Sequence, residues 1–224
     1  MFDLGYFLSS IPLLLKFLYL TITIAILSMA IGLVIGLVLE TLIRRNVAVL
    51  AGAARAYISF FRATPLLVQL FILYYGMPQV IPAMNGMNAY TATVVGISLN
   101  CGAYLAEIIR GAIRAVDVGQ WEAARSVGMT LWQTMRRVVL PQALYVAVPG
   151  FGNTFVTVLK ETSLGFALGL TETMGQAKLM AADTFKFLES FSAAALLYWG
   201  AAMIFGYMQI LIERKMSKPY AKEM

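Results

Sequence analysis

Two series of polar side chains recur at helical spacing within apolar stretches of the chain. The first series is Thr93, Gly96, Asn100, Tyr104 and Glu107, and the second is Gly150, Asn153, Thr154, Thr157 and Glu161. Steps of three and four residues place each series on one face of a helix. Amide, hydroxyl and carboxylate groups in this arrangement can hydrogen-bond to a small polar solute. The pattern therefore predicts recognition and passage of such a solute.

Several kinds of catalysis are excluded by composition. The chain has no histidine and one cysteine, Cys101, which rules out histidine-based catalysis, a disulfide framework and a multi-cysteine metal site. No G-x-x-x-x-G-K-[ST] phosphate loop occurs, so the chain itself is not expected to bind ATP. We therefore expect no catalytic residue, no metal and no directly bound cofactor.

The chain is too apolar for a soluble domain. Of its 224 residues 60% are hydrophobic and 12% are charged, which indicates an integral membrane protein. Polar side chains at membrane depth are costly and normally face a bundle interior or a water-filled path. Any one of Asn100, Asn153, Thr154 or Thr157 could equally serve as a hydrogen bond between helices. Taken jointly, the two series favour a translocation path.

Apolar runs long enough to span a bilayer indicate an all-α, polytopic membrane protein forming one domain over residues 1–224. Five transmembrane helices are predicted, over about 17–40, 60–79, 90–109, 142–162 and 191–213. The Gly32–Gly36 spacing on the first span favours close helix packing. The N-terminal segment lacks a basic region and a cleavage site, so the first span is expected to be retained.

Basic residues fall unequally on the two sides of this arrangement. One side receives Arg44, Arg45, Arg55, Arg62, Arg110, Arg114, Arg125, Arg136, Arg137, Arg214, Lys215, Lys218 and Lys222, and the other receives Lys16, Lys160, Lys178 and Lys186. The side richer in lysine and arginine is expected to be cytoplasmic, which puts the N-terminus out and the C-terminus in. The net charge of +6 is then a topology signal, and no nucleic-acid partner is expected.

Residues 115–141 predict a charged helical hairpin on the cytoplasmic side. Asp117 is a good N-cap with Gln120 three residues later, and Gly128 is a natural C-terminal stop. Thr130 and Gln133 predict a second capping box, and Pro141 is expected to end the second helix. A rigid projection of this kind suits docking by another protein.

The stretch EAARSVGMTLWQTMRRVVLPQA resembles the EAA loop of ABC-importer permeases. Glu122, Ala123, Ala124, Gly128, Leu140 and Pro141 fill the fixed places of that pattern. The resemblance implies a MetI-like fold whose coupling helix sits in a cleft of the ATP-hydrolysing subunit. It implies that contacts to the ATPase come from Trp121, Glu122, Ala123, Ala124, Gly128, Met129 and Thr130.

Two further stretches resemble the polar-amino-acid branch of this family, of the histidine, glutamine and cystine type. They are FRATPLLVQLF, where Ala63 replaces the usual glycine, and LKETSL at residues 159–164. The second implies that the neighbourhood of Glu161 lies close to the substrate. Glu161 shares the polar face whereas Lys160 is turned about 100° away, so Glu161 is the expected ammonium contact. The predicted substrate path comprises Gln69, Asn100, Tyr104, Asn153, Thr157, Glu161, Thr162 and Ser163.

By this resemblance the chain is the non-catalytic permease of a bacterial inner-membrane importer for a polar amino acid such as cystine, glutamine, arginine or histidine. Its implied partners are a cytoplasmic ABC ATPase dimer that binds ATP and Mg²⁺, a second permease (identical or a paralogue), an extracytoplasmic binding protein and membrane lipid. The segment 171–189 is the expected outer docking loop. Two alternatives stay open: a homo-oligomeric channel or passive transporter, which leaves the hairpin without a role, and a structural membrane protein, which leaves the polar faces unexplained.

Overall fold

Helices account for nearly all of the backbone in the computed structural model, which describes residues 2–217 and contains no strand in that range. The helices are α1 (Leu4–Arg44), α2 (Ala48–Ala63), α3 (Leu66–Phe71), α4 (Met77–Val80), α5 (Ala89–Arg114), α6 (Val118–Ser126), α7 (Leu131–Thr134), α8 (Leu140–Glu161), α9 (Thr173–Thr184) and α10 (Phe187–Ser217). Two π-helical turns, Ile72–Gly76 and Met135–Val139, and two 3₁₀ turns, Pro82–Met84 and Thr162–Leu168, complete them. The all-α prediction is confirmed. Lys218 and Lys222, two of the predicted cytoplasmic cations, lie outside the described residues.

Three of these helices, α1, α5 and α10, are long and apolar enough to cross a membrane. A fourth candidate is the pair formed by α2 and the helical run Leu66–Val80, which meet at an angle of 112°. Helix α8, the predicted fourth span, has the length for a span, but polar residues such as Gln142 and Asn153 keep it out of this set. The described residues thus support three or four spans, and the count of five stays a prediction.

The bend between α2 and α3 lies close to the start of the predicted second span, about 60–79. Proline has no N–H and disfavours helical geometry in the residue before it. Thr64 is accordingly extended, with φ −110° and ψ 146°, and Pro65 begins the next helix. The first span is also longer than expected, because the Asp3 side chain accepts a hydrogen bond from the Tyr6 amide at 2.9 Å and starts α1 near the N-terminus.

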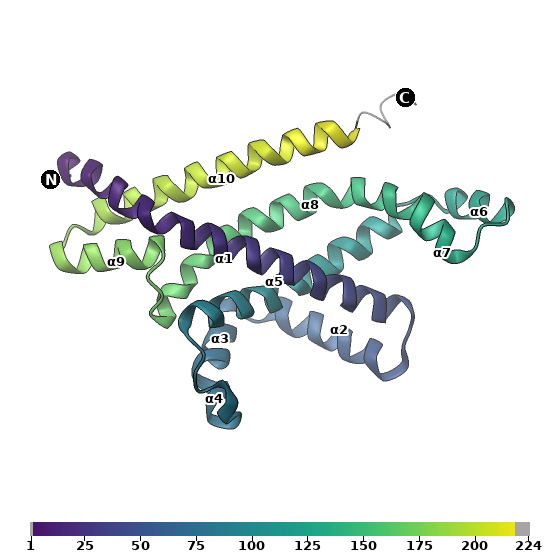
Figure 1. Ribbon diagram of the computed structural model, residues 1–224, viewed down its shortest axis with the longest axis horizontal. Coiled ribbons are helices and arrows are strands. Elements are labelled where there is room, and N and C mark those ends of the chain that lie inside the picture. The colour runs from purple at the N-terminus through teal and green to yellow at the C-terminus, as the bar shows by residue number, and fades with distance from the viewer. Residues whose placement is uncertain (1, 218–224) are drawn as a thin grey trace.

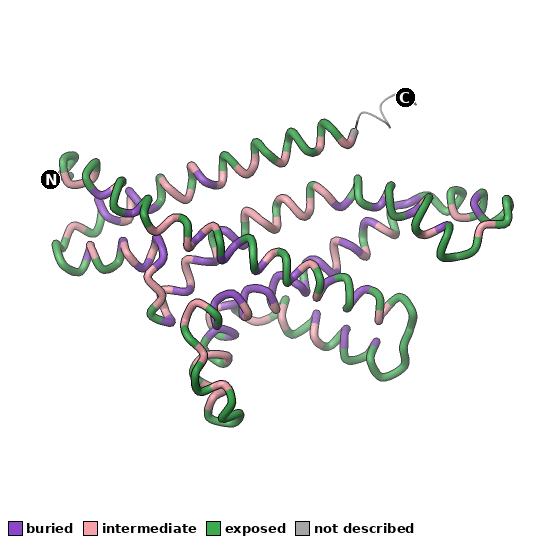
Figure 2. The backbone as a smooth tube through the Cα atoms, in the orientation of Figure 1, coloured by how far each residue is buried: buried purple, intermediate pink, exposed green. Residues whose placement is uncertain are grey.

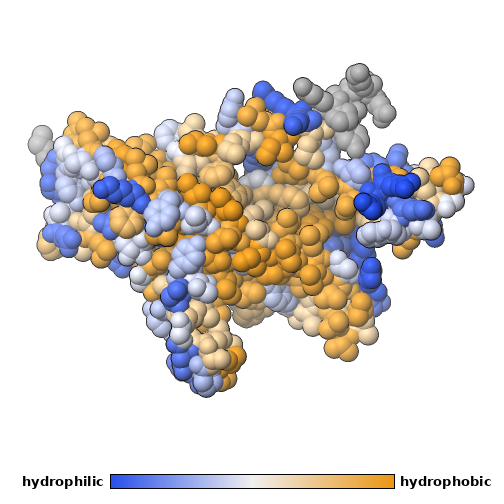
Figure 3. Space-filling model, in the orientation of Figure 1, coloured by the Kyte–Doolittle hydropathy of each residue, from blue (hydrophilic) through white to orange (hydrophobic). Residues whose placement is uncertain are grey.

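The long axis of the molecule separates two polar ends. Figure 1 shows the N-terminus and α9 at one end and α6 and α7 at the other. Figure 3 shows hydrophobic side chains covering much of the surface between them, with hydrophilic residues gathered at both ends. This distribution fits a bilayer crossed roughly along the long axis.

Helices α1 and α5 pack with their backbones in close contact. A Cβ atom at Gly36 would lie 3.0 Å from the Ala106 amide nitrogen and 3.0 Å from Leu105 Cβ, and one at Gly102 would lie 2.7 Å from an Ile35 methyl. A Cβ at Gly32 would collide with the Cys101 sulfur. The predicted close packing at Gly32 and Gly36 is confirmed. It fixes α5 at the centre of the bundle, where Figure 2 shows most of the buried residues.

The segment 171–189, predicted as an outer loop, is instead mostly the ordered helix α9. Its Glu172 is completely buried and accepts hydrogen bonds from the Met174 and Gly175 amides at 2.8 and 3.0 Å. The same carboxylate accepts from the Thr21 hydroxyl at 2.9 Å and the Tyr198 hydroxyl at 2.6 Å. Glu172 thus joins α1, α9 and α10 rather than facing solvent, because a buried carboxylate is retained only when fully hydrogen-bonded.

The N-terminus is fastened to the link between α9 and α10. Lys186 Nζ lies 2.6 Å from Asp3 Oδ2, and the Asp3 amide donates to Glu189 Oε1 at 2.8 Å. The hydrogen bond between the two side chains lowers the pKa of Asp3 and raises the pKa of Lys186. These interactions of Asp3 with Lys186 and Glu189 lie at the end of the molecule away from the hairpin.

Replacing Gly36 with alanine should destabilise the bundle, because the new methyl group meets backbone atoms that cannot rotate away. We expect a loss of about 1–3 kcal/mol, the usual cost of overpacking. Thermal unfolding in detergent measures it. Gly206→Ala is the matched control, because a Cβ there meets nothing within 4 Å. Equal melting temperatures for the two variants would contradict the close contact.

Candidate functional site

A cavity of about 370 Å³ lies between the middle of α5 and α8. Its lining comprises Asn100, Cys101, Tyr104 and Ile108 from α5, and Gly150, Asn153, Thr154, Thr157, Val158 and Glu161 from α8. The two polar series recognised in the sequence therefore face one another across a single space. Five of the eight predicted path residues lie here: Asn100, Tyr104, Asn153, Thr157 and Glu161. Cys101, Ile108 and Val158 complete the walls and were not predicted.

The ends of the first polar series do not reach this cavity. Thr93 is buried and donates to the Ala89 carbonyl at 2.7 Å, and Gly96 is in close contact with the Leu70 side chain. Both positions pack against neighbouring segments because α5 is buried nearly all round near its start. Glu107, at the other end of the series, forms ion pairs instead. Only Asn100 and Tyr104, from the central part of the first polar series, line the cavity.

Asn100 joins the cavity wall to the bend between α2 and α3. Its side-chain amide donates to the Phe61 carbonyl at 3.0 Å and to Gln69 Oε1 at 2.9 Å. Gln69 in turn donates to the Thr64 carbonyl at 3.1 Å and to the Thr64 hydroxyl at 2.8 Å. Gln69 is buried and is not among the cavity residues. The structure thus places it behind the wall, where it satisfies carbonyl groups that the proline leaves without a helical partner.

Glu161 and Lys160 point to different sides of α8, as their helical phase predicted. Glu161 lines the cavity, whereas Lys160 is exposed beside a separate pocket that also contains Ser163. Thr162 is buried and donates to the Leu159 carbonyl at 2.8 Å, and Ser163 donates to the Lys160 carbonyl at 2.7 Å. The two hydroxyl groups therefore cap the end of α8 and do not line the cavity with Glu161.

Three charged residues stand beside the cavity toward the hairpin end of α5. The Glu107 carboxylate is paired with Arg110 and lies 3.5 Å from the Arg62 guanidinium. The Arg62 guanidinium lies 5.6 Å from the centre of the Tyr104 ring, within cation–π range. The cavity thus has the Glu161 carboxylate at one end of its α8 wall and a guanidinium against the Tyr104 ring. The sequence carries no direct signal for this second contact, because it depends on how α2 packs against α5, for example through the Tyr57 hydroxyl, which donates to the Leu99 carbonyl at 2.7 Å.

The hairpin has the caps that the sequence predicts at three of its four ends. The Asp117 side chain accepts from the Gly119 amide at 2.7 Å. Gly128 is left-handed, with φ +81°, and the Met129 amide donates to the Ala124 carbonyl at 3.1 Å, which is a Schellman C-cap. Thr130 and Gln133 form the predicted capping box at 3.3 and 2.8 Å.

Two details of the hairpin differ from the prediction. Pro141 does not end the second helix, because the π-helical turn Met135–Val139 joins α7 directly to α8 and Pro141 lies in the first turn of α8. Such a widened turn accommodates the missing proline N–H without a break. Gln120 does not complete a capping box with Asp117, and its side-chain oxygen instead accepts from Gln142 at 3.3 Å, which ties α6 to α8.

The residues predicted to contact the ATPase divide between two faces of the hairpin. Glu122, Ala123, Gly128 and Thr130 are exposed, Trp121 and Met129 are half-buried, and Ala124 is buried. Trp121 packs toward the cluster of Ala112, Val116 and Val139 at the base of the hairpin. The exposed face can dock against another protein, whereas Trp121 and Ala124 hold α6 on the bundle.

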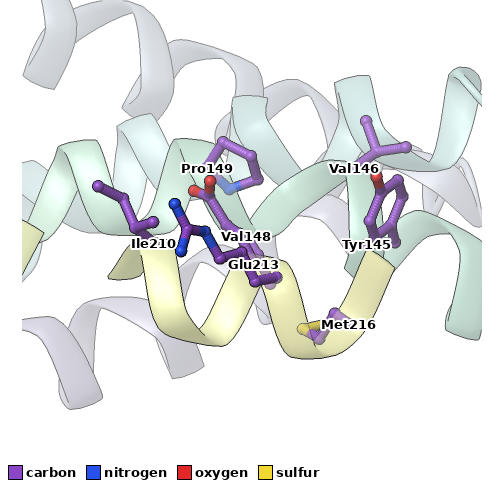
Figure 4. A pocket seen from close by; sticks show the side chains of 8 residues that line it. Tyr145, Val146, Val148, Pro149, Ile210, Glu213 and Met216 are labelled. Atoms are coloured by element: carbon purple, nitrogen blue, oxygen red, sulfur yellow. The ribbon is translucent and has the colours of Figure 1, made fainter. Parts of the chain in front are cut away.

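A second cavity, of about 580 Å³, lies where α10 passes α8 near the C-terminal end of the described chain. Figure 4 shows its lining, which includes Tyr145 and Pro149 from α8 and Ile210 and Glu213 from α10. Gln209 donates to the Pro149 carbonyl at 3.3 Å and to Glu213 Oε1 at 2.8 Å. None of the predicted path residues lies in this cavity.

Comparison with known proteins identifies the fold and the family. The family described as the binding-protein-dependent transport system inner membrane component matches residues 30–218. The chain belongs to this family. It is 46% identical over 218 residues to the probable amino-acid permease protein YxeN of Bacillus subtilis (strain 168), covering 97% of each chain.

Solved structures agree with this assignment. The crystal structure of an amino acid ABC transporter with histidines superimposes with a TM-score of 0.89 at 35% identity, over 96% of this chain and 99% of that one. An inward-facing structure of the MetNI methionine ABC transporter gives a TM-score of 0.77 at 21% identity, over 91% and 96%. The predicted MetI-like, all-helical permease fold is therefore confirmed. The chain is a membrane component that carries no catalytic residues itself, and a separate subunit hydrolyses ATP.

Asn100→Ala should destabilise the protein, because it leaves the buried Gln69 oxygen without a donor and removes one of the two side-chain donors to the Phe61 carbonyl. Leaving buried polar groups unpaired costs about 1–3 kcal/mol. Thermal unfolding in detergent measures the loss. The control is Asn153→Ala, since Asn153 is exposed in the same cavity and should change stability little. A larger loss for Asn153 than for Asn100 would show that the bend does not depend on this network.

Proposed function

We propose that the cavity between α5 and α8 is the substrate path of an ATP-driven importer for a polar amino acid. The observation that carries the proposal is the convergence of Asn100, Tyr104, Asn153, Thr157 and Glu161, from two predicted spans, on one cavity. The family membership and the names of the similar proteins support an amino acid as the substrate. The passage of a zwitterion requires polar partners of this kind along the path.

The two ends of the cavity suit the two charges of an amino acid. The Glu161 carboxylate is the proposed partner of the ammonium group. The exposed Asn153 side-chain amide can donate hydrogen bonds to the carboxylate, and the Arg62 guanidinium near the Tyr104 ring adds positive potential nearby. Thr162 and Ser163, whose hydroxyl groups bond to the backbone, are proposed to hold Glu161 in place rather than touch the substrate.

A second permease is proposed to close the open side of this cavity. Tyr104 is 41% exposed, and Asn153 and Thr157 are also exposed on the isolated chain. Polar side chains that faced lipid tails at this depth would be costly. A symmetric pair, of two copies or of this chain with a paralogue, would place these side chains on a shared path. Two-fold pairing is the commonest closed arrangement.

The hairpin is proposed to transmit ATPase motion to the path. Helix α6 ends in a fixed Schellman cap, and the helix from Leu131 to Glu161 is continuous through the π-helical turn. A displacement of α6 would therefore move α8, which forms one of the two walls of the cavity. The ATPase dimer, with its ATP and Mg²⁺, and an extracytoplasmic binding protein complete the proposed transporter. Directional transport requires that the substrate bind the two states of the path differently.

The hairpin end is proposed to be cytoplasmic, with the N-terminus outside. Arg44, Arg114 and Arg136 gather at this end, whereas Lys178 and Lys186 lie with α9 at the other. This distribution follows the preference of lysine and arginine for the cytoplasmic side. It also places the exposed residues of α6 where an ATPase can reach them.

Glu161→Gln should impair uptake, because it removes the charge proposed to bind the ammonium group. The loss of a charge-assisted hydrogen bond costs about 1.5–3 kcal/mol, or roughly 10- to 100-fold in apparent affinity. The measurement is uptake of a panel of labelled amino acids into proteoliposomes containing the whole transporter. Lys160→Gln is the control, since Lys160 lies outside the cavity. Unchanged half-saturation for Glu161→Gln would remove Glu161 from the path.

Ala123→Trp should uncouple the transporter by adding bulk to the exposed face of α6 without changing its backbone. We expect the ATPase to be lost on co-purification and uptake to fall to background, while the permease stays folded. Gly128→Trp should do the same, and Gly128→Asn is its control, because asparagine tolerates the left-handed conformation at φ +81°. Normal uptake with Ala123→Trp would argue against docking by this face.

A further inference from the structure

A groove of about 590 Å³ lies where the end of α1 meets α5 and the start of the hairpin's second helix. Its lining joins three parts of the chain: Leu37, Glu40, Thr41, Arg44 and Arg45; Ile109 and Ile113; and Leu131, Trp132, Met135 and Leu140. None of these residues lines the α5–α8 cavity. The groove is therefore a separate feature, and the substrate path leaves it unexplained.

The walls of the groove continue the apolar surface of α1. Val34, Leu37 and Val38 are exposed on the membrane-spanning part of that helix. The next turn brings Thr41, and then Arg44 and Arg45 where the helix ends. On the opposite wall Leu131 and Trp132 are 65% and 67% exposed. An apolar groove that ends in arginine and tryptophan is typical of the boundary between lipid tails and headgroups.

The charge of the groove is positive once its internal ion pair is counted. Glu40 is buried, and its carboxylate lies 3.5 Å from the Arg44 guanidinium, so these two charges offset one another. Arg45 is exposed, and among residues 2–217 no hydrogen bond or ion pair of its side chain is found. One guanidinium thus remains available at the mouth of an apolar groove.

We propose that this groove binds an anionic phospholipid. The acyl chains lie along Leu37 and Ile109 in continuity with the lipid-facing surface of α1, and the phosphate meets Arg45. Trp132 stands at headgroup level. Because Leu131 and Trp132 begin the helix that follows the α6 hairpin turn, the lipid braces the base of the coupling hairpin against α1. The binding itself does not depend on the proposed transport activity.

Native mass spectrometry of the full-length chain in mild detergent tests the proposal, with phosphatidylglycerol and phosphatidylcholine titrated separately. We expect one tight site for phosphatidylglycerol and none for phosphatidylcholine. Arg45→Gln should weaken that site about fivefold, the effect of one basic residue at a membrane surface. Thr41→Trp, which fills the groove with an indole ring, should abolish it. Uptake is not part of this readout, so the failure of the substrate path would leave the result intact.

Two matched variants control for charge and for bulk. Arg55→Gln removes an exposed arginine outside the groove. Thr23→Trp adds the same indole ring at an exposed position of α1 nearer the N-terminus, outside the groove. The Arg55→Gln and Thr23→Trp variants should both bind phosphatidylglycerol as tightly as the native chain does. Arg45 is exposed and has no ion pair within the described range 2–217, so the Arg45→Gln variant should fold even if Thr41→Trp does not. Equal binding of the two lipids, or equal weakening by Arg45→Gln and Arg55→Gln, would overturn the proposal. So would displacement of a co-purifying ATPase by Thr41→Trp with lipid binding unchanged, since the groove would then be a protein interface.

Discussion

The backbone contact between α1 and α5 is the constraint on which the remaining arrangement depends. Gly36 and Gly102 allow the two helices to approach until a methyl group would lie 2.7–3.0 Å from its neighbours. In a bilayer, helices gain little from hydrophobic burial against one another, so close van der Waals contact between small residues supplies much of the attraction. With one face of α5 held in this way, its opposite face is left to carry Asn100 and Tyr104 toward α8. The α5 wall of the cavity is thus held in place by the contacts on the other side of the same helix.

The breaks in the helices are stabilised by hydrogen bonds from side chains or by widened helical turns. A backbone group without a partner is costly inside a membrane, so irregular backbone must be satisfied by the protein itself. Gln69 and Asn100 supply donors to carbonyl groups at the Thr64–Pro65 bend, and Gln209 supplies one to Pro149. The two π-helical turns each lie directly before a proline-containing first turn, at Pro78 and Pro141. Pro65, Pro78 and Pro141 are therefore each accompanied by a local adjustment that keeps the chain helical or hydrogen-bonded.

The sequence carried most of the fold and the centre of the cavity, for identifiable reasons. Helical periodicity fixes which residues share a face, and so Asn153, Thr157 and Glu161 were assigned to one wall correctly. Periodicity does not show which residues of a helix face line open space, and so Gln69 and Thr162, both predicted for the path, are buried and do not line the cavity. Proline is ambiguous from sequence alone: the chain bends by 112° at Pro65, between α2 and α3, whereas Pro141 does not end the predicted second helix of the hairpin. Burial of Glu172 was also beyond reach, because Thr21 and Tyr198 come from distant parts of the chain.

The exposed surfaces of the spans differ in a way that bears on assembly. Helix α10 exposes Trp199, Met203 and Tyr207, and Figure 2 shows exposed residues alternating with partly buried ones along it. Apolar side chains of this kind are stable among lipid tails, and tryptophan and tyrosine are also favoured at the bilayer surface. The wall formed by α5 and α8 exposes the Asn153 amide and the Thr157 hydroxyl instead, which lipid tails cannot satisfy. These exposed amide and hydroxyl groups fit the proposed second permease on the α5–α8 side, whereas the apolar surface of α10 fits lipid. On this proposal the chain supplies one wall of the path and its partner supplies the other.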